Sequence, residues 1–246
     1  MPCPESGRAI FTKPAGGSLQ TAPAAYGPLV QLDFPGVSIS FSPECIILHS
    51  ETVLNTLSSA VVGGGFTRTH VILNRHVDKQ YDHPDPPAEL RAFAVRMGIT
   101  GPFVGLMTAA YLETARSMVL QRDGLRVGVL LTAGLSNATS AGLSPPVAMR
   151  PGTINQVLLV DANLSPAAMV NLVITATEAK TDTLRRLGVL TPAGEPATGT
   201  STDAVVIACT GRGPVLPYAG PVTPVGWLVA QAVRQCLAAC LSDDSR

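Results

Sequence analysis

The sequence predicts a single compact domain of the α/β or α+β class, in which helices pack on a mixed sheet. Short β-branched runs bounded by turn residues recur along the chain, and one long segment after residue 165 has a helical period. Hydrophobic residues make up 46% of the 246 residues, which is enough to bury a full core. We expect a flexible leader at 1–25, where Pro, Gly, Ser and Ala lack periodicity, and one folded domain at 26–246.

The first part of this domain is expected to be mainly sheet. Pro-Gly and Ser-Pro turn signals separate alternating or β-branched runs, which favours an antiparallel meander. The expected strands are Leu29–Asp33, Val37–Phe41, Cys45–His49 and His70–Asn74. The consecutive residues Pro86 and Pro87 should end any regular element there.

The middle of the chain contains two similar apolar segments, Val104–Ala110 and Val127–Gly134. Each is expected to be a buried strand that runs into a Thr-Ala turn. The segment between them, Ala110–Gln121, has helical character. A further buried strand is expected at Ile154–Asp161.

The last third of the chain is expected to hold the two longest helices. Ser165 can cap a helix of about six turns that starts at Pro166, and Gly188 can end it. The remaining expected elements are a polar loop, a buried strand and a final helix, at Thr198–Thr202, Ala204–Ala208 and Val225–Leu241.

Charge and cysteine content argue against several classes of function. Lys and Arg number 17, as do Asp and Glu, so no net charge attracts nucleic acid or anionic lipid. No secretory signal is visible, and no apolar run reaches the roughly 18 residues of a membrane span. The five cysteines form no CxxC pair and do not suggest a disulfide framework. We expect a cytoplasmic protein with neither a nucleic-acid nor a membrane partner.

A lysine on the buried face of the long helix is the first candidate functional residue. That face is defined by residues at three- and four-residue steps: Met169, Leu172, Val173, Ala176, Thr183, Leu184 and Leu187. Lys180 falls near its centre, whereas Glu178 falls on the opposite side. Because an unpaired buried ammonium is costly, Lys180 either reaches an ion partner or serves a site. Asp182 is expected to pair with Arg185 or Arg186 on a solvated face.

Two glycine-containing segments allow a ligand to approach closely. Thr198-Gly199-Thr200-Ser201-Thr202-Asp203 concentrates hydroxyls and a carboxylate before an apolar strand, so it can offer donors to an oxyanion or phosphate. It lacks the GxxxxGK[ST] spacing of a P-loop, and a turn with local hydrogen bonds is its alternative role. Gly63-Gly64-Gly65 either admits a ligand or forms an irregular turn.

The histidines and cysteines give little support for metal or triad chemistry. The four histidines form no HExxH motif or other helical metal pair. Four residues of ligand type do share one loop: His76, Asp78, Asp82 and His83. No GxSxG elbow is present, and Cys209 lies in an apolar run where a small buried side chain is expected. We therefore expect no protein-bound metal or other cofactor.

Several motifs together resemble the adenosylcobinamide amidohydrolase family, from about Val37 to Leu241. In the N-terminal half these are Ser58-Ser59-Ala60, Gly63-Gly64-Gly65, Asn74 and Tyr81. In the C-terminal half they are Gly152-Thr153-Ile154-Asn155, Thr175-Ala176-Thr177-Glu178-Ala179-Lys180 and Thr198-Gly199-Thr200-Ser201-Thr202-Asp203-Ala204. Several ordered motifs are far more specific than one glycine pattern.

The resemblance implies hydrolysis of the amide that holds the aminopropanol arm of adenosylcobinamide. The products would be adenosylcobyric acid and 1-amino-2-propanol, which serve cobinamide salvage for coenzyme B12 synthesis. The partner would thus be a corrinoid, with cobalt present only within this substrate. A homo-oligomer is compatible with the sequence, which does not fix the number of copies.

An amide is a poor electrophile with a poor leaving group, so the site must activate water, hold the oxyanion and protonate the amine. We expect Glu178 or Asp203 to activate water, Lys180 to stabilise charge or deliver a proton, and Asn155 to orient the amide. A hydroxyl nucleophile at Thr200 or Ser59 is the alternative. The expected substrate-binding residues are Ser59, Gly63, Gly64, Gly65, Asn74, Thr198, Gly199, Thr200 and Thr202.

Two other functions fit the same residues. A noncatalytic corrinoid-binding protein would use the cleft without hydrolysis, and a nucleotide- or phosphate-handling enzyme would use the loop Thr198–Asp203. Release of free aminopropanol separates hydrolysis from binding, and nucleotide consumption would indicate phosphotransfer.

Overall fold

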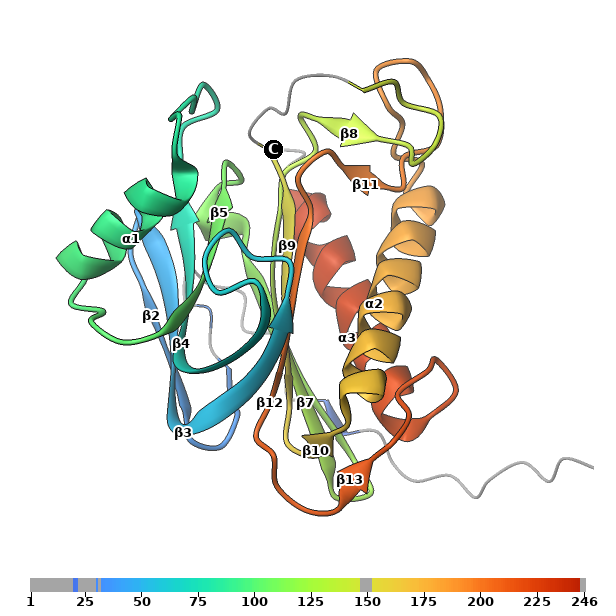
Figure 1. Cartoon of the computed structure of the whole chain (residues 1–246). Coiled ribbons are helices and arrows are strands. Elements are labelled where there is room, and N and C mark those ends of the chain that lie inside the picture. Colours follow the sequence, from blue (N-terminus) through green and yellow to red (C-terminus); the bar gives the residue numbers. More distant parts are fainter. Residues whose placement is uncertain (1–19, 22–29, 31, 147–151, 244–246) are drawn as a thin grey trace, which may run out of the picture.

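The computed structural model describes residues 20–21, 30, 32–146 and 152–243 (Figure 1). Its main sheet contains β1 (Gln20–Thr21), β2 (Val37–Phe41), β3 (Cys45–Ser58), β4 (Gly65–His76), β5 (Phe103–Thr108), β6 (Arg116–Arg122), β7 (Leu125–Ala133), β9 (Ile154–Val160) and β12 (Ala204–Cys209). The helices are α1 (Pro86–Arg96), α2 (Pro166–Arg186) and α3 (Pro224–Asp243). The short elements are a 3-10 turn (Leu112–Thr114), β8 (Ala138–Thr139), β10 (Asn163–Leu164), β11 (Gly199–Thr200) and β13 (Val215–Leu216).

The main sheet is mixed, as the sequence predicts. Its strand order is β1-β6-β7-β9-β12-β3-β4-β5, and β2 pairs with β3 beside this path. Within it, β9 pairs with β12 in parallel and β4 with β5 in parallel, while the other pairs are antiparallel. The expected fold class, one domain with a mixed sheet and packed helices, is therefore confirmed.

The sheet curls because its long central strand changes partners along its length. The first part of β3 pairs with β2 and its last part with β12, and its register against β4 shifts between His49 and Leu54. We call β1, β6, β7, β9 and β12 the β9 half, and β2, β3, β4 and β5 the β4 half. Leu106 of β5 and Val157 of β9 belong to one buried cluster although their strands are not neighbours. The inner faces of the two halves therefore pack on each other.

Helices cover the outer face of each half (Figure 1). On the β9 half, α2 and α3 contribute Leu172 and Leu228 to a cluster that includes Leu158 of β9. On the β4 half, Leu90 and Phe93 of α1 pack with buried side chains of β3, β4 and β5. The order of layers is thus α2 and α3, β9 half, β4 half, α1.

The boundaries of α2 follow the signals in the sequence. The Ser165 hydroxyl accepts a hydrogen bond from the Ala168 amide at 3.0 Å, and Pro166 occupies the first turn, where no amide hydrogen is needed. Gly188 has a φ of +68°, the left-handed geometry that commonly follows a helix end. The predicted cap, start and stop of this helix are confirmed.

Among the described residues, α3 is the one helix that length and composition would allow to cross a membrane. Half of its apolar stretch is buried inside the fold. Leu228, Val233 and Leu237 lie in the cluster shared with β7 and α2, so packing within the domain accounts for its apolar character.

The structure corrects the helix expected at Ala110–Gln121. A short 3-10 turn is followed by strand β6, which pairs with β7 across a tight turn. Asp123 and Gly124 in this turn have φ values of +51° and +77°, as a two-residue hairpin requires. The Asp-Gly pair is a strong hairpin signal, so the helical interpretation was wrong because it overlooked turn chemistry.

Two further expectations in the first part of the chain were also wrong. Pro86 and Pro87 begin α1 rather than ending an element, because the first turn of a helix needs no amide hydrogens and Asp85 caps it through the Ala88 amide at 3.0 Å. Val30, Leu32 and Asp33 form no strand, while Leu29 and Gln31 lie outside the described residues.

The expected leader falls mostly outside the described residues. Within it, Gln20 and Thr21 pair with Gln121 and Leu120 of β6. The other expected strands, Val37–Phe41, Cys45–His49, His70–Asn74, Val104–Ala110, Val127–Gly134, Ile154–Asp161 and Ala204–Ala208, coincide with or fall mostly within observed strands, and a helix covers Val225–Leu241.

Replacing Phe93 by alanine should destabilise the protein by about 3–5 kcal/mol, because the ring anchors α1 in the core and is only 2% exposed. Val95→Ala on the same helix is the matched control, since that side chain is 66% exposed. Its cost should stay below about 1 kcal/mol. Chemical denaturation of both variants measures the difference, and equal midpoints would contradict the packing described for α1.

Candidate functional site

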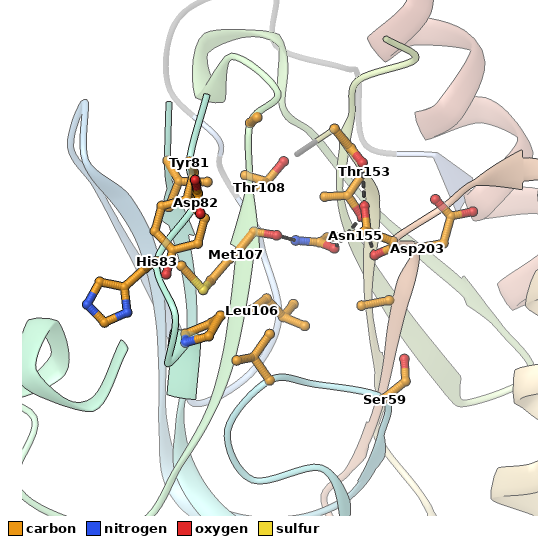
Figure 2. Close-up of a pocket in the computed structure, with 17 residues that line it drawn as sticks. Ser59, Tyr81, Asp82, His83, Leu106, Met107, Thr108, Thr153, Asn155 and Asp203 are labelled. Carbon is orange, nitrogen blue, oxygen red and sulfur yellow. Dashed lines mark hydrogen bonds between the residues drawn. The ribbon is translucent and has the colours of Figure 1, made fainter. Parts of the chain in front are cut away.

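A cavity of about 510 Å³ opens at one end of the layers, between the β4 and β9 halves. Residues 106–109, at the end of β5, form the floor of the cavity. The wall on the β9 half is formed by Gly152, Thr153, Asn155 and residues 202–204. The turn after β3 contributes Ser59 and Val61. The loop after β4 supplies the opposite wall, so Tyr81, Asp82 and His83 lie across the cavity from Asn155 (Figure 2).

Hydrogen bonds hold the side chain of Asn155 in the cavity wall. Its side-chain amide nitrogen donates to Asn74 Oδ1 at 2.8 Å and to the Met107 carbonyl at 2.9 Å. Because a backbone carbonyl only accepts hydrogen bonds, the amide group near it must be the NH₂. Asn74 in turn donates to Thr132 Oγ1 at 3.1 Å, which links β9, β4, β5 and β7. The Asn155 side chain thus has one orientation.

This orientation decides what Asn155 can offer a ligand. Both hydrogens of its amide are used inside the protein, and the whole residue is only 2% exposed. Thr153 Oγ1 lies 3.3 Å from Asn155 Oδ1, but its single hydrogen is donated to the Thr202 carbonyl at 2.6 Å. Asn155 Oδ1 can therefore accept a hydrogen bond from an N–H group, whereas the residue cannot donate to an oxyanion.

Behind the same wall lies an ion pair between α2 and the start of β12. Lys180 Nζ is 2.5 Å from Asp203 Oδ2, and the two side chains are 8% and 16% exposed. Asp203 Oδ1 accepts from Thr200 Oγ1 at 2.5 Å and from the Ile154 amide at 3.0 Å. Three donors therefore occupy the carboxylate, whose oxygens point away from the cavity in Figure 2.

Gly199 makes room for this ion pair. A Cβ atom at that position would lie 2.2 Å from Asp203 Oδ2 and 2.6 Å from Lys180 Nζ. Any side chain would therefore displace one member of the pair. The backbone of Gly199 and Thr200 forms β11, which pairs with β8. The glycine of this polar loop thus serves the protein's own lysine and aspartate.

Hydroxyl groups hold the cavity wall of the β9 half together. Thr153 Oγ1 donates to the Thr202 carbonyl at 2.6 Å, and Thr202 Oγ1 donates to the Gly152 carbonyl at 2.5 Å. Asn137 Nδ2 donates to Ser201 Oγ at 2.8 Å. The segments before β9 and before β12 are therefore locked to each other where they line the cavity.

The opposite wall is held by a network behind Tyr81. The Tyr81 hydroxyl donates to Glu89 Oε2 at 2.7 Å, and Arg75 Nη1 lies 2.6 Å from Glu89 Oε1. Burial and the hydrogen bond to the Glu89 carboxylate raise the pKa of the Tyr81 phenol. Burial alone would raise the pKa of Glu89, but the hydrogen bonds from Tyr81 and Arg75 bring it below its ordinary value. Tyr81 therefore remains a neutral hydroxyl bound to an ionised Glu89.

The structure places the residues predicted for the site in three groups. Four line the cavity: Ser59, Asn155, Thr202 and Asp203. Five lie directly behind these residues or in the loop that supports them: Asn74, Lys180, Thr198, Gly199 and Thr200. The remaining four do not line it: Glu178, Gly63, Gly64 and Gly65.

The positions of the last group have plain structural reasons. Glu178 is exposed on the outer face of α2, as its place in the helical period predicts. Gly63 has a φ of +69°, and a Cβ there would lie 2.4 Å from the Phe103 carbonyl. The glycine triplet therefore allows the turn between β3 and β4 to pack against β5.

Sequence reasoning missed part of the lining. Thr108 and Thr153 were not singled out as site residues, and the loop with Asp82 and His83 was considered only for metal binding. In that loop, Asp78 Oδ1 instead accepts from the Gln80 amide at 2.7 Å. Among the described residues no three His, Cys, Asp or Glu side chains gather as metal ligands. The Pro-rich polar loop directly after a strand was the signal that could have marked this wall.

Two other expectations concern single side chains. Asp182 pairs with Arg186 at 2.7 Å, as predicted, and also with Arg234 of α3 at 2.6 Å. Hydrogen bonds from these two arginines lower the pKa of Asp182. Cys209 is buried, in agreement with its predicted packing role, and the four cysteines in the described part of the chain form no disulfide.

Comparisons with a family model and with known proteins point to the same family. Residues 34–246 match the family described as adenosylcobinamide amidohydrolase. A Methanosarcina mazei protein with that name is 33% identical over 184 residues, which cover 71% of this chain and 84% of that protein. A Halobacterium salinarum protein of the same name is 44% identical over 148 residues, or 57% of this chain and 58% of that protein. The PH0078 protein from Pyrococcus horikoshii OT3 aligns over 91% of this chain and 83% of its own with a TM-score of 0.46 and 13% identity, too low to support an argument.

Replacing Lys180 by methionine should lower the free energy of unfolding by about 3–5 kcal/mol, because it strands the Asp203 carboxylate in a largely buried position. The double variant Lys180→Met/Asp203→Asn should recover part of this loss, since asparagine can still accept from Thr200 and Ile154. Denaturant midpoints measure both effects.

Arg186→Met is the matched control for this prediction. It removes a cation from an ion pair on the same helix, but Arg186 is 74% exposed, so the cost should stay within about 1 kcal/mol. A Lys180→Met protein that is as stable as the wild type yet inactive would contradict the positioning role of the ion pair. It would support a catalytic role for Lys180 instead.

Proposed function

Since the chain belongs to the adenosylcobinamide amidohydrolase family, we propose that it hydrolyses the aminopropanol amide of adenosylcobinamide. The products would be adenosylcobyric acid and 1-amino-2-propanol, a reaction that serves cobinamide salvage. The family fixes the class of reaction as amide hydrolysis. The cavity between the two halves of the sheet is the place where we propose that it occurs.

The observation that carries this assignment is the fixed acceptor at Asn155. The scissile group is a secondary amide, which has one N–H and one carbonyl. Asn155 Oδ1 lies in the cavity wall with a lone pair to spare, and its amide hydrogens are held by Asn74 and Met107. It therefore suits the N–H of the substrate amide, and it would hold the departing amine in place as the C–N bond breaks.

Two hydroxyl groups of the cavity have a hydrogen to donate to the substrate. Ser59 Oγ accepts from the Val205 amide at 3.1 Å, and Thr108 Oγ1 accepts from the Ala110 amide at 3.0 Å. In each case the hydroxyl oxygen is the acceptor, so its hydrogen is left to donate. We assign the Thr108 hydrogen to the carbonyl oxygen, where negative charge develops during attack, because Thr108 follows Met107, which Asn155 contacts. Ser59 lies at the opposite end of the cavity (Figure 2), so its hydrogen would serve another polar group of the substrate.

The size of the cavity determines how a corrinoid can bind. A volume of about 510 Å³ is typical of a pocket for a drug-sized ligand, whereas adenosylcobinamide is much larger. The side arm that carries the amide would therefore enter, while the corrin ring lies across the mouth. Leu106, Met107 and Ala109 give the floor an apolar surface without aromatic rings for stacking.

The Lys180–Asp203 pair takes a positioning role in this proposal. The pair fixes Asp203, which lines the cavity. Because Asp203 also accepts a hydrogen bond from the Ile154 amide, it fixes the backbone next to Asn155. Glu178 is exposed on the outer face of α2 and takes no part. The buried free cysteines support a location in the reducing cytoplasm.

The first test of this function is release of 1-amino-2-propanol from adenosylcobinamide by the purified protein. Asn155→Ala should lower kcat/KM by about 10- to 100-fold, the loss of one hydrogen bond that strengthens as the amine departs. Asn74→Ala is the matched control, because it removes a neighbouring buried amide but leaves Asn155 bonded to Met107. Its effect on kcat/KM should be smaller.

Three results would argue against the proposal in different ways. Tight corrinoid binding without release of amine would indicate a carrier protein. Nucleotide consumption without amide cleavage would indicate a phosphate-handling enzyme. Equal losses of kcat/KM in the two asparagine variants would remove the specific role of Asn155.

We also propose that cobalt is present only within the substrate and that the protein supplies no metal of its own. The poor ligand spacing of the histidines supports this. Turnover should be unchanged after prolonged treatment with a chelator and removal of the chelated metal by gel filtration. A loss of activity that zinc or another divalent ion restores would overturn this part of the proposal.

A further inference from the structure

Amide hydrolysis by water requires a group that removes a proton from the attacking water. Within the described residues, two acidic residues line the cavity, Asp82 and Asp203. Asp203 is occupied by Lys180, Thr200 and the Ile154 amide, so it can take a proton only by giving up part of this network. The other carboxylate is the one available for the reaction.

The carboxylate of Asp82 is not held by such a network. No hydrogen bond or ion pair to its carboxylate occurs in the part of the chain that the structure describes. The residue is exposed at the cavity, on the wall that faces Asn155 (Figure 2). Water that enters from the mouth can therefore lie between Asp82 and an amide held by Asn155.

The backbone around Asp82 is held firmly. The Val77 amide donates to the Thr108 carbonyl at 2.8 Å, and the Tyr81 amide donates to the Asp78 carbonyl at 3.0 Å. The Tyr81 side chain is bound to Glu89. The loop is thus tied to β5 through Val77 and to α1 through Tyr81, the residue directly before Asp82, which favours a preorganised backbone position for Asp82.

The neighbours of Asp82 are less suited to remove a proton. His83 Nδ1 accepts from the Asp85 amide at 3.0 Å, so the neutral ring carries its hydrogen on Nε2. Tyr81 donates its hydroxyl hydrogen to Glu89, and burial together with this bond raises the pKa of its phenol. His83 can therefore donate a hydrogen bond, and Tyr81 remains neutral.

Resting on the proposed function, we infer that Asp82 is the general base of the hydrolysis. Its carboxylate takes a proton from water while the water oxygen forms a bond to the amide carbon. The C–N bond then breaks, its electron pair stays on nitrogen, and Asp82 returns the proton to that nitrogen. The new carboxylic acid loses its remaining proton to the amine, so the products are a carboxylate and an ammonium.

Asp82→Asn tests this role, because it keeps the size of the side chain and removes the ionisable group. We expect kcat to fall by about 10²- to 10⁴-fold, the usual contribution of a general base. The dissociation constant for cobinamide, followed by the visible absorption of the corrinoid, should stay within about threefold of wild type. Asp82→Glu should keep more activity than Asp82→Asn.

Asp78→Asn is the matched control. It changes a carboxylate in the same loop that does not line the cavity, and asparagine can still accept from the Gln80 amide. Its kcat should match that of the wild type. Thermal midpoints of all variants should agree, since Asp82 is exposed.

The possible results separate this inference from the proposed function. If the wild type releases aminopropanol and Asp82→Asn keeps its kcat, Asp82 is not the base although the protein is the hydrolase. If the variant loses activity only through weaker binding of cobinamide, Asp82 binds substrate and the inference is again overturned. If the wild type releases no aminopropanol, the proposed function fails, and the inference fails with it.

Discussion

The amide group of Asn155 is the interaction on which the site depends. It joins the β9 half of the sheet to the β4 half, through Asn74 and the Met107 carbonyl, at the point where the halves separate to form the cavity. A buried polar group of this kind is costly unless all its hydrogens are bonded, so the strands must keep their spacing. The same bonds leave Asn155 Oδ1 able to accept a hydrogen bond, which we propose comes from the substrate amide. In this proposal, fold stability and substrate orientation rest on one side chain.

The Lys180–Asp203 pair supports the cavity wall of the β9 half from the side of α2. It connects α2 to the segment before β12, and Asp203 also holds the backbone at Ile154, beside Asn155. Gly199 is required because a Cβ would occupy the space of the ion pair. The shape of this cavity wall would then depend on an ion pair that lies behind it, while the opposite wall carries the carboxylate of Asp82.

Local signals in the sequence predicted much of the fold. The cap at Ser165, the glycine stop and the period of α2 placed Lys180 in the buried face, where it is 7% exposed. Strands with β-branched runs were also recognisable. The strand β6 was not, because its Asp-Gly hairpin turn was overlooked, and α1 was missed because prolines at a helix start were taken as a break.

The candidate site was only partly predictable, for a physical reason. Asn155 and Asp203 were named from motifs, but whether a side chain faces a cavity or a buried partner depends on contacts across the curled sheet. Asp203 is bonded to Lys180, which is 23 residues away in the sequence, and Asn155 is bonded to Asn74, which is 81 residues away. No local pattern encodes such pairs. Asp82 was visible in the sequence as part of a polar loop, but its place opposite Asn155 follows only from the fold.

The most direct measurement of the central claim is a crystal structure of the protein with adenosylcobinamide, trapped at low temperature or in a slow variant. The account predicts that the aminopropanol arm enters the cavity between the two halves of the sheet. The nitrogen of its amide should lie within hydrogen-bond distance, about 2.7–3.2 Å, of Asn155 Oδ1. An arm bound elsewhere on the protein, or an amide carbonyl rather than an N–H facing Asn155, would contradict it.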